Sequence, residues 1–256
     1  MKLLNSVRSV LSLLGVLLWF VVPGLPWLYF VIVPATWLWP RKRTDLVSWY
    51  MKGICAGILG LLRLGGARFT RSGRIPTLPP CLILMNHQSL VDILTVSMMS
   101  VPHVPAFVTR VRYSRFIPLV SPCIRLLGAP VIDPREPRKA LSEIREKTRS
   151  QERAILVFPE GHRSKNGEIQ PFRAGGTQAV LAAKRMPVYL VVSDGLWQGR
   201  RFVDFVFNVH LMRGTTEVLG PFEPPEREED VPAFLERMRE TMIARLRERR
   251  SGAEAA

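Results

Sequence analysis

The sequence predicts an α/β fold with a mostly parallel central sheet covered by helices, preceded by an N-terminal membrane-embedded helical hairpin. Three observations lead to this fold class. An uncharged, apolar segment covers residues 9–40, and short strand-like apolar runs alternate with helical patterns through the rest of the chain. The length of 256 residues suffices for one such domain with an appendage. We therefore expect the hairpin in residues 1–50 and the α/β domain in residues 51–256.

The apolar segment is longer than the roughly 20 residues of one membrane span and shorter than two spans. Pro23, Gly24 and Pro26 interrupt it near its middle, where they are expected to break or kink a helix. Basic residues flank both ends, which favours a hairpin with both ends on the cytoplasmic side. One kinked transmembrane helix is the alternative. A cleaved signal peptide is disfavoured, because the run is too long and no cleavage motif follows it. The apolar residues 49–64 are expected to lie against either the membrane or the domain.

Six short apolar runs have the length and composition of buried strands. They cover residues 67–71, 81–85, 104–109, 129–132, 154–158 and 187–192. Helical patterns over residues 90–99, 135–151 and 175–185 lie between them, and such alternation predicts parallel strands. The basic residues 236–250 carry an apolar stripe, which predicts a helix packed on the domain, with contact to anionic lipid as the alternative. Ligands of such sheets bind at the carboxyl ends of the strands, so function is expected in the loops that follow them.

Composition narrows the class of partner. Lysine and arginine outnumber aspartate and glutamate by 36 to 21, and the net charge of +15 indicates a polyanionic partner. The apolar N-terminus favours an anionic membrane surface over nucleic acid, for which no basic-aromatic motif is present. Cys55, Cys81 and Cys123 are odd in number and form no CxxC pair, so neither a disulfide framework nor a zinc site is expected.

The stretch NHQSLVD, residues 86–92, follows one of the predicted strands. If the next helix begins at Ser89, Ser89 is its N-cap and Asp92 is the second member of a capping box, which is a purely structural role. His87 then lies in the loop ahead of the helix, from which its ring can reach Asp92. A carboxylate on one ring nitrogen fixes the tautomer and leaves the other nitrogen to accept a substrate proton. The sequence leaves both roles of Asp92 open.

A second polar stretch, FPEGHRSKNGEIQPFRAGG, covers residues 158–176 after another predicted strand. It carries Glu160, Arg163, Lys165 and Arg173 and leads into a glycine-rich helix start. Unpaired N–H groups at a helix start, with arginines nearby, form a natural phosphate site. A merely solvated loop is the alternative, and it is disfavoured because long loops in compact domains are mostly functional. The sequence contains no G-x-S-x-G elbow, H-E-x-x-H motif or P-loop, so attack by a substrate hydroxyl is favoured over a covalent enzyme intermediate.

The order and spacing of NHQSLVD, FPEGHRS and FRAG resemble those of the glycerolipid acyltransferase family, in particular the lysophosphatidic acid acyltransferases, over roughly residues 50–220. The resemblance implies transfer of a fatty acyl group from acyl-CoA or acyl carrier protein to the free hydroxyl of a lysophospholipid, above all 1-acylglycerol-3-phosphate. It places this reaction at the cytoplasmic face of the cell membrane and implies no cofactor or metal. His87 matches the general base and Asp92 its orienting partner. The substrate-binding residues that the resemblance implies are Asn86, Arg135, Glu160, Gly161, Arg163, Ser164 and Arg173.

Four positions depart from the family's motifs. His162 stands where threonine is usual, and Arg173 replaces lysine. Pro134 displaces Arg135 by one position, and the motif around Pro187 has one proline where the family usually has two. These departures leave the acceptor open, so an acyltransferase for another lysolipid, such as an amino-acid-containing lipid, stays an alternative.

A noncatalytic membrane lipid-binding protein is the alternative from another class, with NHQSLVD a mere capped helix. Replacing Asp92 by asparagine distinguishes the two, since it preserves much of the cap but is expected to spoil the tautomer of His87.

Overall fold

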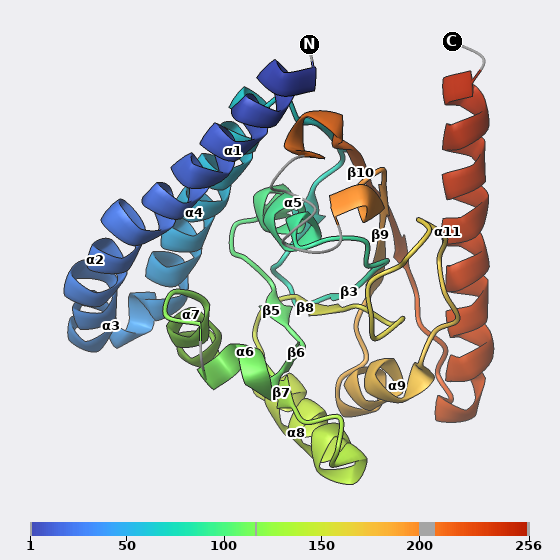
Figure 1. The fold of residues 1–256 in the computed structure, drawn as a ribbon. Coiled ribbons are helices and arrows are strands. Elements are labelled where there is room, and N and C mark those ends of the chain that lie inside the picture. The colour runs from blue at the N-terminus through green and yellow to red at the C-terminus, as the bar shows by residue number, and fades with distance from the viewer. Residues whose placement is uncertain (1, 116, 200–207, 255–256) are drawn as a thin grey trace.

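The computed structural model describes residues 2–115, 117–199 and 208–254. A long helical hairpin lies on one side of a central sheet, and the C-terminal helix lies on the other side (Figure 1). This is the predicted α/β architecture.

The first arm of the hairpin is helical from Lys2 to Leu38. Its consecutive segments are α1 (Lys2–Trp19), the π-helical turn η1 (Phe20–Gly24), α2 (Leu25–Trp27), the π-helical turn η2 (Leu28–Ile32) and α3 (Val33–Leu38). The chain reverses at Trp39 and the 3-10 helix η3 (Pro40–Lys42). The second arm, α4 (Arg43–Leu64), returns beside α1 (Figure 1).

The expected break at Pro23, Gly24 and Pro26 is therefore wrong: the apolar segment forms a single helical arm, as in the alternative of one long helix, and the hairpin arises because α4 supplies the second arm. A proline has no N–H to donate, and its ring clashes with the carbonyl four residues earlier in a regular α-helix. Pro23 lies within the π turn η1, and Pro26 lies at the start of α2. The wider π turn moves the clashing carbonyl away, so the helix continues through the prolines. The reversal lies instead where Trp39 leaves helical dihedrals, at φ −126° and ψ 70°.

Residues 5–38 and 40–64 form two helices that are long and apolar enough, by length and composition, to cross a membrane. Large apolar side chains are exposed along them, among them Phe30, Trp37 and Trp49. Other side chains of the hairpin are buried against the domain, where Leu28 and Ile32 belong to the same apolar cluster as Cys123 of α7 (Val120–Leu126) and the flanking Leu119 and Leu127. The hairpin thus packs on the domain along one face and presents an apolar face outward.

The central sheet has the strand order β1-β10-β9-β3-β8-β5. These strands are β1 (Arg68–Ser72), β10 (Arg213–Phe222), β9 (Val188–Asp194), β3 (Leu82–Met85), β8 (Ile155–Val157) and β5 (Ala106–Phe107). All neighbours pair in parallel except β10 and β9, which are antiparallel. The carboxyl ends of β3, β8 and β9 consequently meet at one edge.

Four predicted strands lie in this sheet close to the expected residues, and the other two differ. The run 104–109 divides into β5 and β6 (Thr109–Arg110), and the run 129–132 shortens to β7 (Val131–Ile132), which pairs with β6 in a separate small sheet. A second small sheet pairs β2 (Ile75–Pro76) with β4 (Ser100–Val101). Strand β10 was not predicted, because its sequence RGTTEVLGPF mixes polar residues, glycine and proline without clear alternation.

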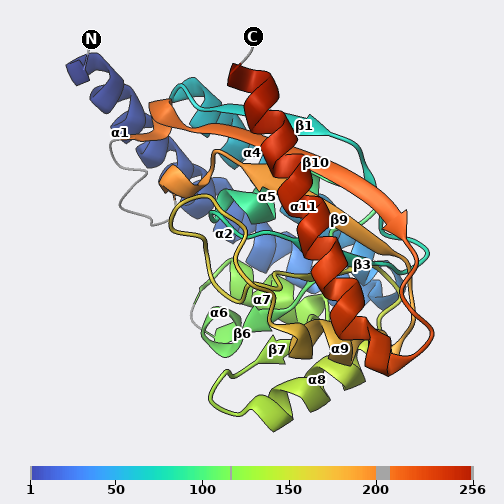
Figure 2. The same ribbon diagram turned by 90° about the vertical axis from the view of Figure 1, so that its right-hand side faces the viewer.

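Helices cover both faces of the sheet. The alternating strand residues Ile83 and Met85 share an apolar cluster with α5 (Val91–Met99), whereas Leu82 and Leu84 share one with α9 (Ala174–Ala183) and the C-terminal helix α11 (Val231–Glu254). Figure 2 shows α11 lying across β9 and β10. Its predicted apolar stripe is buried against the sheet, which confirms the expected packing. The remaining helices of the described residues are α6 (Val111–Arg115), α8 (Pro137–Arg149), η4 (Trp197–Gly199), η5 (Val209–Leu211) and η6 (Glu228–Asp230).

Candidate active site

His87 lies just beyond the carboxyl end of β3, at the edge where the parallel strands meet. Its Nδ1 is 2.9 Å from Oδ2 of Asp92, and the ring stacks on Phe158, with centroids 4.0 Å apart. A carboxylate oxygen only accepts, so Nδ1 carries the proton and Nε2 is the ring nitrogen that can take up another. The His87 side chain is 14% exposed and that of Asp92 is fully buried. The pair therefore has the geometry of a general base with its orienting carboxylate.

Four donors surround the Asp92 carboxylate. Oδ2 accepts from His87 Nδ1 and from the backbone N–H groups of Gln88, at 2.6 Å, and Ser89, at 2.8 Å. Oδ1 accepts from the hydroxyl of Ser193 at 3.1 Å, at the end of β9. One carboxylate thus fixes the loop backbone and the histidine ring together, which answers the question that the sequence left open.

The predicted capping box is only half present. Helix α5 begins at Val91 with Leu90 as its N-cap, and the Ser89 hydroxyl donates to the carbonyl of Gly199 at 2.6 Å. The predicted assignment of Ser89 as the N-cap is wrong, because the helix starts later and the N–H of Asp92 donates to the Ser89 carbonyl rather than to its hydroxyl. Among the described residues, the hydroxyl accepts only the N–H of Val91, at 3.4 Å. The reciprocal bond from Ser89 N–H to Asp92 remains.

Glu160 joins the two polar stretches at the level of the backbone. Its Oε1 accepts the N–H of His87 at 2.7 Å, and its Oε2 accepts the N–H of Gln170 at 2.9 Å. The side chain is 1% exposed, and this burial raises the pKa of Glu160 to about 7, against the opposing effect of its two backbone hydrogen bonds. Both oxygens are occupied, so Glu160 holds the loops of His87 and Gln170 in register.

Two other predicted substrate-binding residues also serve the framework. The Asn86 amide pairs with the backbone of Ser193, donating to its carbonyl at 2.8 Å and accepting its N–H at 2.7 Å. Ser164 donates its N–H to the carbonyl of His87 at 2.7 Å and its hydroxyl to the carbonyl of Glu168 at 2.8 Å. These contacts tie the end of β3 to the end of β9 and to the loop after β8.

Gly161 marks a tight turn of the same loop. Its φ of +72° belongs to the region that favours glycine, and a Cβ there would lie 3.2 Å from Cδ of Arg173. Its carbonyl accepts a 2.7 Å hydrogen bond from Nη2 of Arg110, at the end of β6. Arg173 is exposed at the start of α9, and Arg163 is half-buried on the loop. Three arginines are thereby brought near one turn.

Arg135 lies apart from the His87–Asp92 pair, on the exposed segment after β7. It lines a depression of about 360 Å³ whose other lining residues are Arg110, Val111, Arg112, Arg115, Asp133 and Pro134. Arg110 belongs to this depression and also contacts Gly161, so it connects the basic depression to the loop after β8. Four arginines around one hollow suit a phosphate group.

Sequence reasoning missed Arg110, Gln88 and Ser193. Arg110 and Ser193 each follow a predicted strand by one residue, so the rule that sites form at the carboxyl ends of strands could have found them. Gln88 carried no such signal, since its importance depends on loops distant in the sequence. Within the described residues, no group of three or more His, Cys, Asp and Glu side chains could hold a metal ion.

A family model described as Acyltransferase matches residues 67–193, which include β3, β8, all but the last residue of β9, and both polar stretches. The 1-acyl-sn-glycerol-3-phosphate acyltransferase of Cocos nucifera is 26% identical over 75% of this chain, which spans 61% of that protein's length. The human 1-acyl-sn-glycerol-3-phosphate acyltransferase alpha is 27% identical over 87% of this chain and 78% of its own length.

Among solved structures, the 1-acyl-sn-glycerophosphate (LPA) acyltransferase PlsC from Thermotoga maritima has the same fold. Its TM-score is 0.70 at 19% identity, and the match covers 96% of this chain and 98% of that one. The motifs, the fold and these matches agree: the chain belongs to the acyltransferase family that includes the 1-acyl-sn-glycerol-3-phosphate acyltransferases.

Proposed function

We propose that this acyltransferase moves a fatty acyl group from acyl-CoA or acyl carrier protein to the free hydroxyl of a lysophospholipid, with His87 as the general base. The acceptor that we propose is 1-acylglycerol-3-phosphate, which gives phosphatidic acid and which the named relatives take as substrate by their names. The observation that carries the proposal is the 2.9 Å contact between His87 Nδ1 and the buried Asp92 carboxylate, at the edge of the sheet where the basic loops converge.

In the proposed reaction, Nε2 of His87 takes the proton of the acceptor hydroxyl as its oxygen attacks the thioester carbonyl. The tetrahedral intermediate collapses with cleavage of the carbon–sulfur bond, and the leaving thiolate takes the proton back from the imidazolium. Asp92 stabilises the imidazolium that exists between these two transfers. General-base assistance of this kind contributes roughly 10² to 10⁴ in rate.

The acceptor phosphate is assigned to the arginines. Arg110, Arg135, Arg163 and Arg173 supply the positive charge, and the depression beside Arg110 and Arg135 supplies the concave surface. Guanidinium groups bind phosphate oxygens in pairs, which orients the glycerol as well as attracting it. Asn86, Glu160, Gly161 and Ser164 are assigned to positioning rather than to substrate contact, because their polar groups bind other groups of the protein: backbone groups for Asn86, Glu160 and Ser164, and the Arg110 side chain for the carbonyl of Gly161.

The hairpin is assigned to the cytoplasmic face of the cell membrane. Its exposed tryptophan and phenylalanine side chains suit the apolar layer, and Arg41, Lys42 and Arg43 follow the reversal of the chain, where anionic headgroups would meet them. A lipid acceptor then reaches the site by diffusion within the membrane.

The test is a transfer assay with purified protein in detergent. Two donors, acyl-CoA and acyl carrier protein loaded with a fatty acyl group, each carry the radiolabel in the acyl chain. Each donor is incubated with a panel of lysolipids that have phosphate, phosphocholine or amino-acid headgroups. We expect 1-acylglycerol-3-phosphate to gain the most label. Preferential labelling of another lysolipid would overturn the proposal that 1-acylglycerol-3-phosphate is the acceptor. Absence of label from every acceptor with both donors would overturn the proposal that the protein transfers acyl groups.

A further inference from the structure

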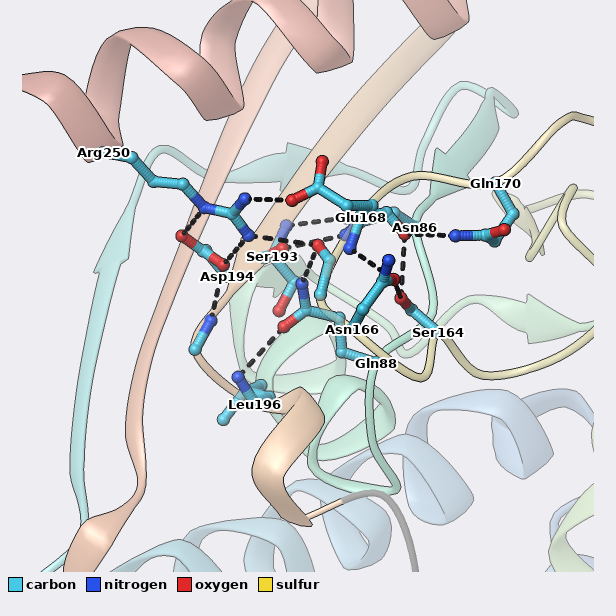
Figure 3. A network of polar contacts seen from close by, with 12 residues as sticks. Asn86, Gln88, Ser164, Asn166, Glu168, Gln170, Ser193, Asp194, Leu196 and Arg250 are labelled. Atoms are coloured by element: carbon cyan, nitrogen blue, oxygen red, sulfur yellow. Dashed lines mark hydrogen bonds and ion pairs between the residues drawn. The ribbon is translucent and has the colours of Figure 1, made fainter.

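We propose that Arg250, near the end of α11, is a positioning residue for His87 and Asp92, and the inference rests on the proposed function. The residue is more than 150 positions from His87 in the sequence and lies outside the matched region of residues 67–193. Figure 3 shows its guanidinium between the loop after β8 and the end of β9.

One guanidinium group holds both of these segments. Nε and Nη2 bind the two carboxylate oxygens of Asp194 at 3.0 and 2.8 Å. Nη1 binds Oε1 of Glu168 at 2.5 Å, and Nη2 also donates to the carbonyl of Gly167 at 3.2 Å. Such a planar fork fixes the direction of its partners as well as their distance, which an ammonium group would not do.

The charge state supports this arrangement. Burial alone would raise the pKa of Asp194, but the hydrogen bonds and charge of Arg250 outweigh it, and the pKa of the Asp194 carboxyl lies below its ordinary value. The N–H of Gly195 also donates to Asp194 Oδ1 at 2.8 Å. Asp194 is therefore ionised at neutral pH and bound from both sides.

The two segments that Arg250 joins grip the side chain of Gln88. Its Nε2 donates to the carbonyl of Gly167 at 3.1 Å, and its Oε1 accepts the N–H of Leu196 at 3.0 Å (Figure 3). Gln88 is fully buried. Its amide thus needs both partners in place, because an unpaired amide group in the interior is costly.

Gln88 in turn acts on the catalytic pair through its backbone. Its N–H donates to Asp92 Oδ2 at 2.6 Å, and it directly follows His87 in the chain. The path from Arg250 is therefore short: two loop segments, the side chain of Gln88, and the backbone that aims His87 at Asp92. The loop between β8 and α9 contains no helix or strand of its own, so side-chain clamps of this kind fix its shape.

A comparable arginine on α11 separates positioning from simple stabilisation. Arg245 also makes a forked ion pair, with Nε and Nη2 at 2.9 and 2.7 Å from the Glu217 carboxylate, but Glu217 lies on β10, and the partners of its carboxylate among the described residues are Arg245 and Arg249 of α11. Exposed ion pairs contribute little to global stability because water screens them, and both arginine side chains are about one-third exposed. Arg245→Gln is thus the matched control for Arg250→Gln.

The experiment measures kcat, KM and the thermal midpoint for both variants beside the unchanged chain. We expect Arg250→Gln to lower kcat on the order of tenfold or more with a small change in KM, since small misplacement of reacting groups is expensive. Arg245→Gln should stay within about twofold in kcat, with a similar change in thermal midpoint. An Arg250→Gln variant with the kcat of the unchanged chain would overturn the proposal, as would equal losses in both variants.

Two further measurements keep the test decisive. Asp194→Asn retains the shape of the side chain, so it should lower kcat like Arg250→Gln, and the double variant should be no worse than either single variant. The NMR signal of the His87 Nδ1 proton should weaken or shift in Arg250→Gln and stay unchanged in Arg245→Gln. This NMR signal does not depend on acyl transfer, so the two claims fail separately. Absence of transferase activity in the unchanged chain would overturn the proposed function. An unchanged His87 signal in Arg250→Gln would overturn the positioning role of Arg250.

Discussion

Replacing Asp92 by asparagine changes the charge of the site with very little change in shape. Three donors converge on Oδ2: the His87 Nδ1–H and the N–H groups of Gln88 and Ser89. The amide oxygen must take this position, because an NH₂ group there would face three other donors. The NH₂ group then replaces Oδ1 and meets the hydroxyl of Ser193, which can rotate to accept. The structure therefore predicts that His87 keeps its tautomer in this variant, contrary to the expectation from sequence, and that only the negative charge is lost.

The magnitude follows from the distance. For unit charges 2.9 Å apart and an effective dielectric constant of about 20, Coulomb's law gives roughly 6 kcal/mol between imidazolium and carboxylate. At 1.36 kcal/mol per factor of ten, the full loss corresponds to about 10⁴ in rate. The asparagine oxygen retains a hydrogen bond to Nδ1–H, so we expect kcat to fall by about 10² to 10⁴.

Steady-state transfer to 1-acylglycerol-3-phosphate measures this effect, and thermal unfolding provides the control. Because the network of hydrogen bonds is preserved, the free energy of unfolding should change by only about 1 kcal/mol. A kcat within threefold of the unchanged chain would refute the reasoning, since it would mean that no imidazolium forms during the reaction.

Three further predictions concern other contacts of the site. Ser193→Ala removes the donor to Asp92 Oδ1, and the loss of about 1 kcal/mol should lower kcat roughly fivefold; unchanged kinetics would show that this hydroxyl is dispensable. Gly195→Ala should lower the free energy of unfolding by more than about 2 kcal/mol, because φ is +75° and a Cβ would collide with the carbonyl of Arg213. The control Gly128→Ala, at φ +60° with open space around it, should lower it by only about 1 kcal/mol, and chemical denaturation that ranks the two variants in reverse order would contradict this. The pKa of Glu160 is raised from 4.5 to about 7 in the folded state, so folding favours its protonated form, and the free energy of unfolding should fall by about 3 kcal/mol as pH rises from about 4.5 to above 7. Glu160→Gln should flatten this pH dependence, and an equally steep dependence in the variant would exclude Glu160 as its source.

The alternation of apolar runs and helical patterns was enough to predict the fold, because buried parallel strands and amphipathic helices impose different periods on the sequence. Two features were not readable in this way. Strand β10 pairs antiparallel to β9 with a sequence of mixed polarity, and its place depends on tertiary contacts with β1 and β9. Pro23 is read as a helix breaker by local rules, but a π turn accommodates it and the helix continues.

The site was predictable to the extent that its residues are close in sequence. His87 and Asp92 stand five positions apart in one loop and helix start, and the structure brings them together. The roles of Asn86, Glu160 and Ser164 were not predictable, because each binds a backbone group at least 70 residues away. The same reason hides Arg250, whose partners lie in the loop after β8 and at the end of β9. Local patterns identify the groups that we propose to react, whereas their supports depend on the tertiary structure.

The rate of acyl transfer by a His87→Ala variant tests the central claim most directly. The ring of His87 contacts Asp92 and Phe158 through its side chain, while its backbone N–H to Glu160 is unaffected by the change. The variant should therefore fold and bind membranes like the unchanged chain, and its kcat for transfer from acyl-CoA to 1-acylglycerol-3-phosphate should fall by at least about 10². Transfer at a near-normal rate by the folded variant would contradict the assignment of His87 as the base.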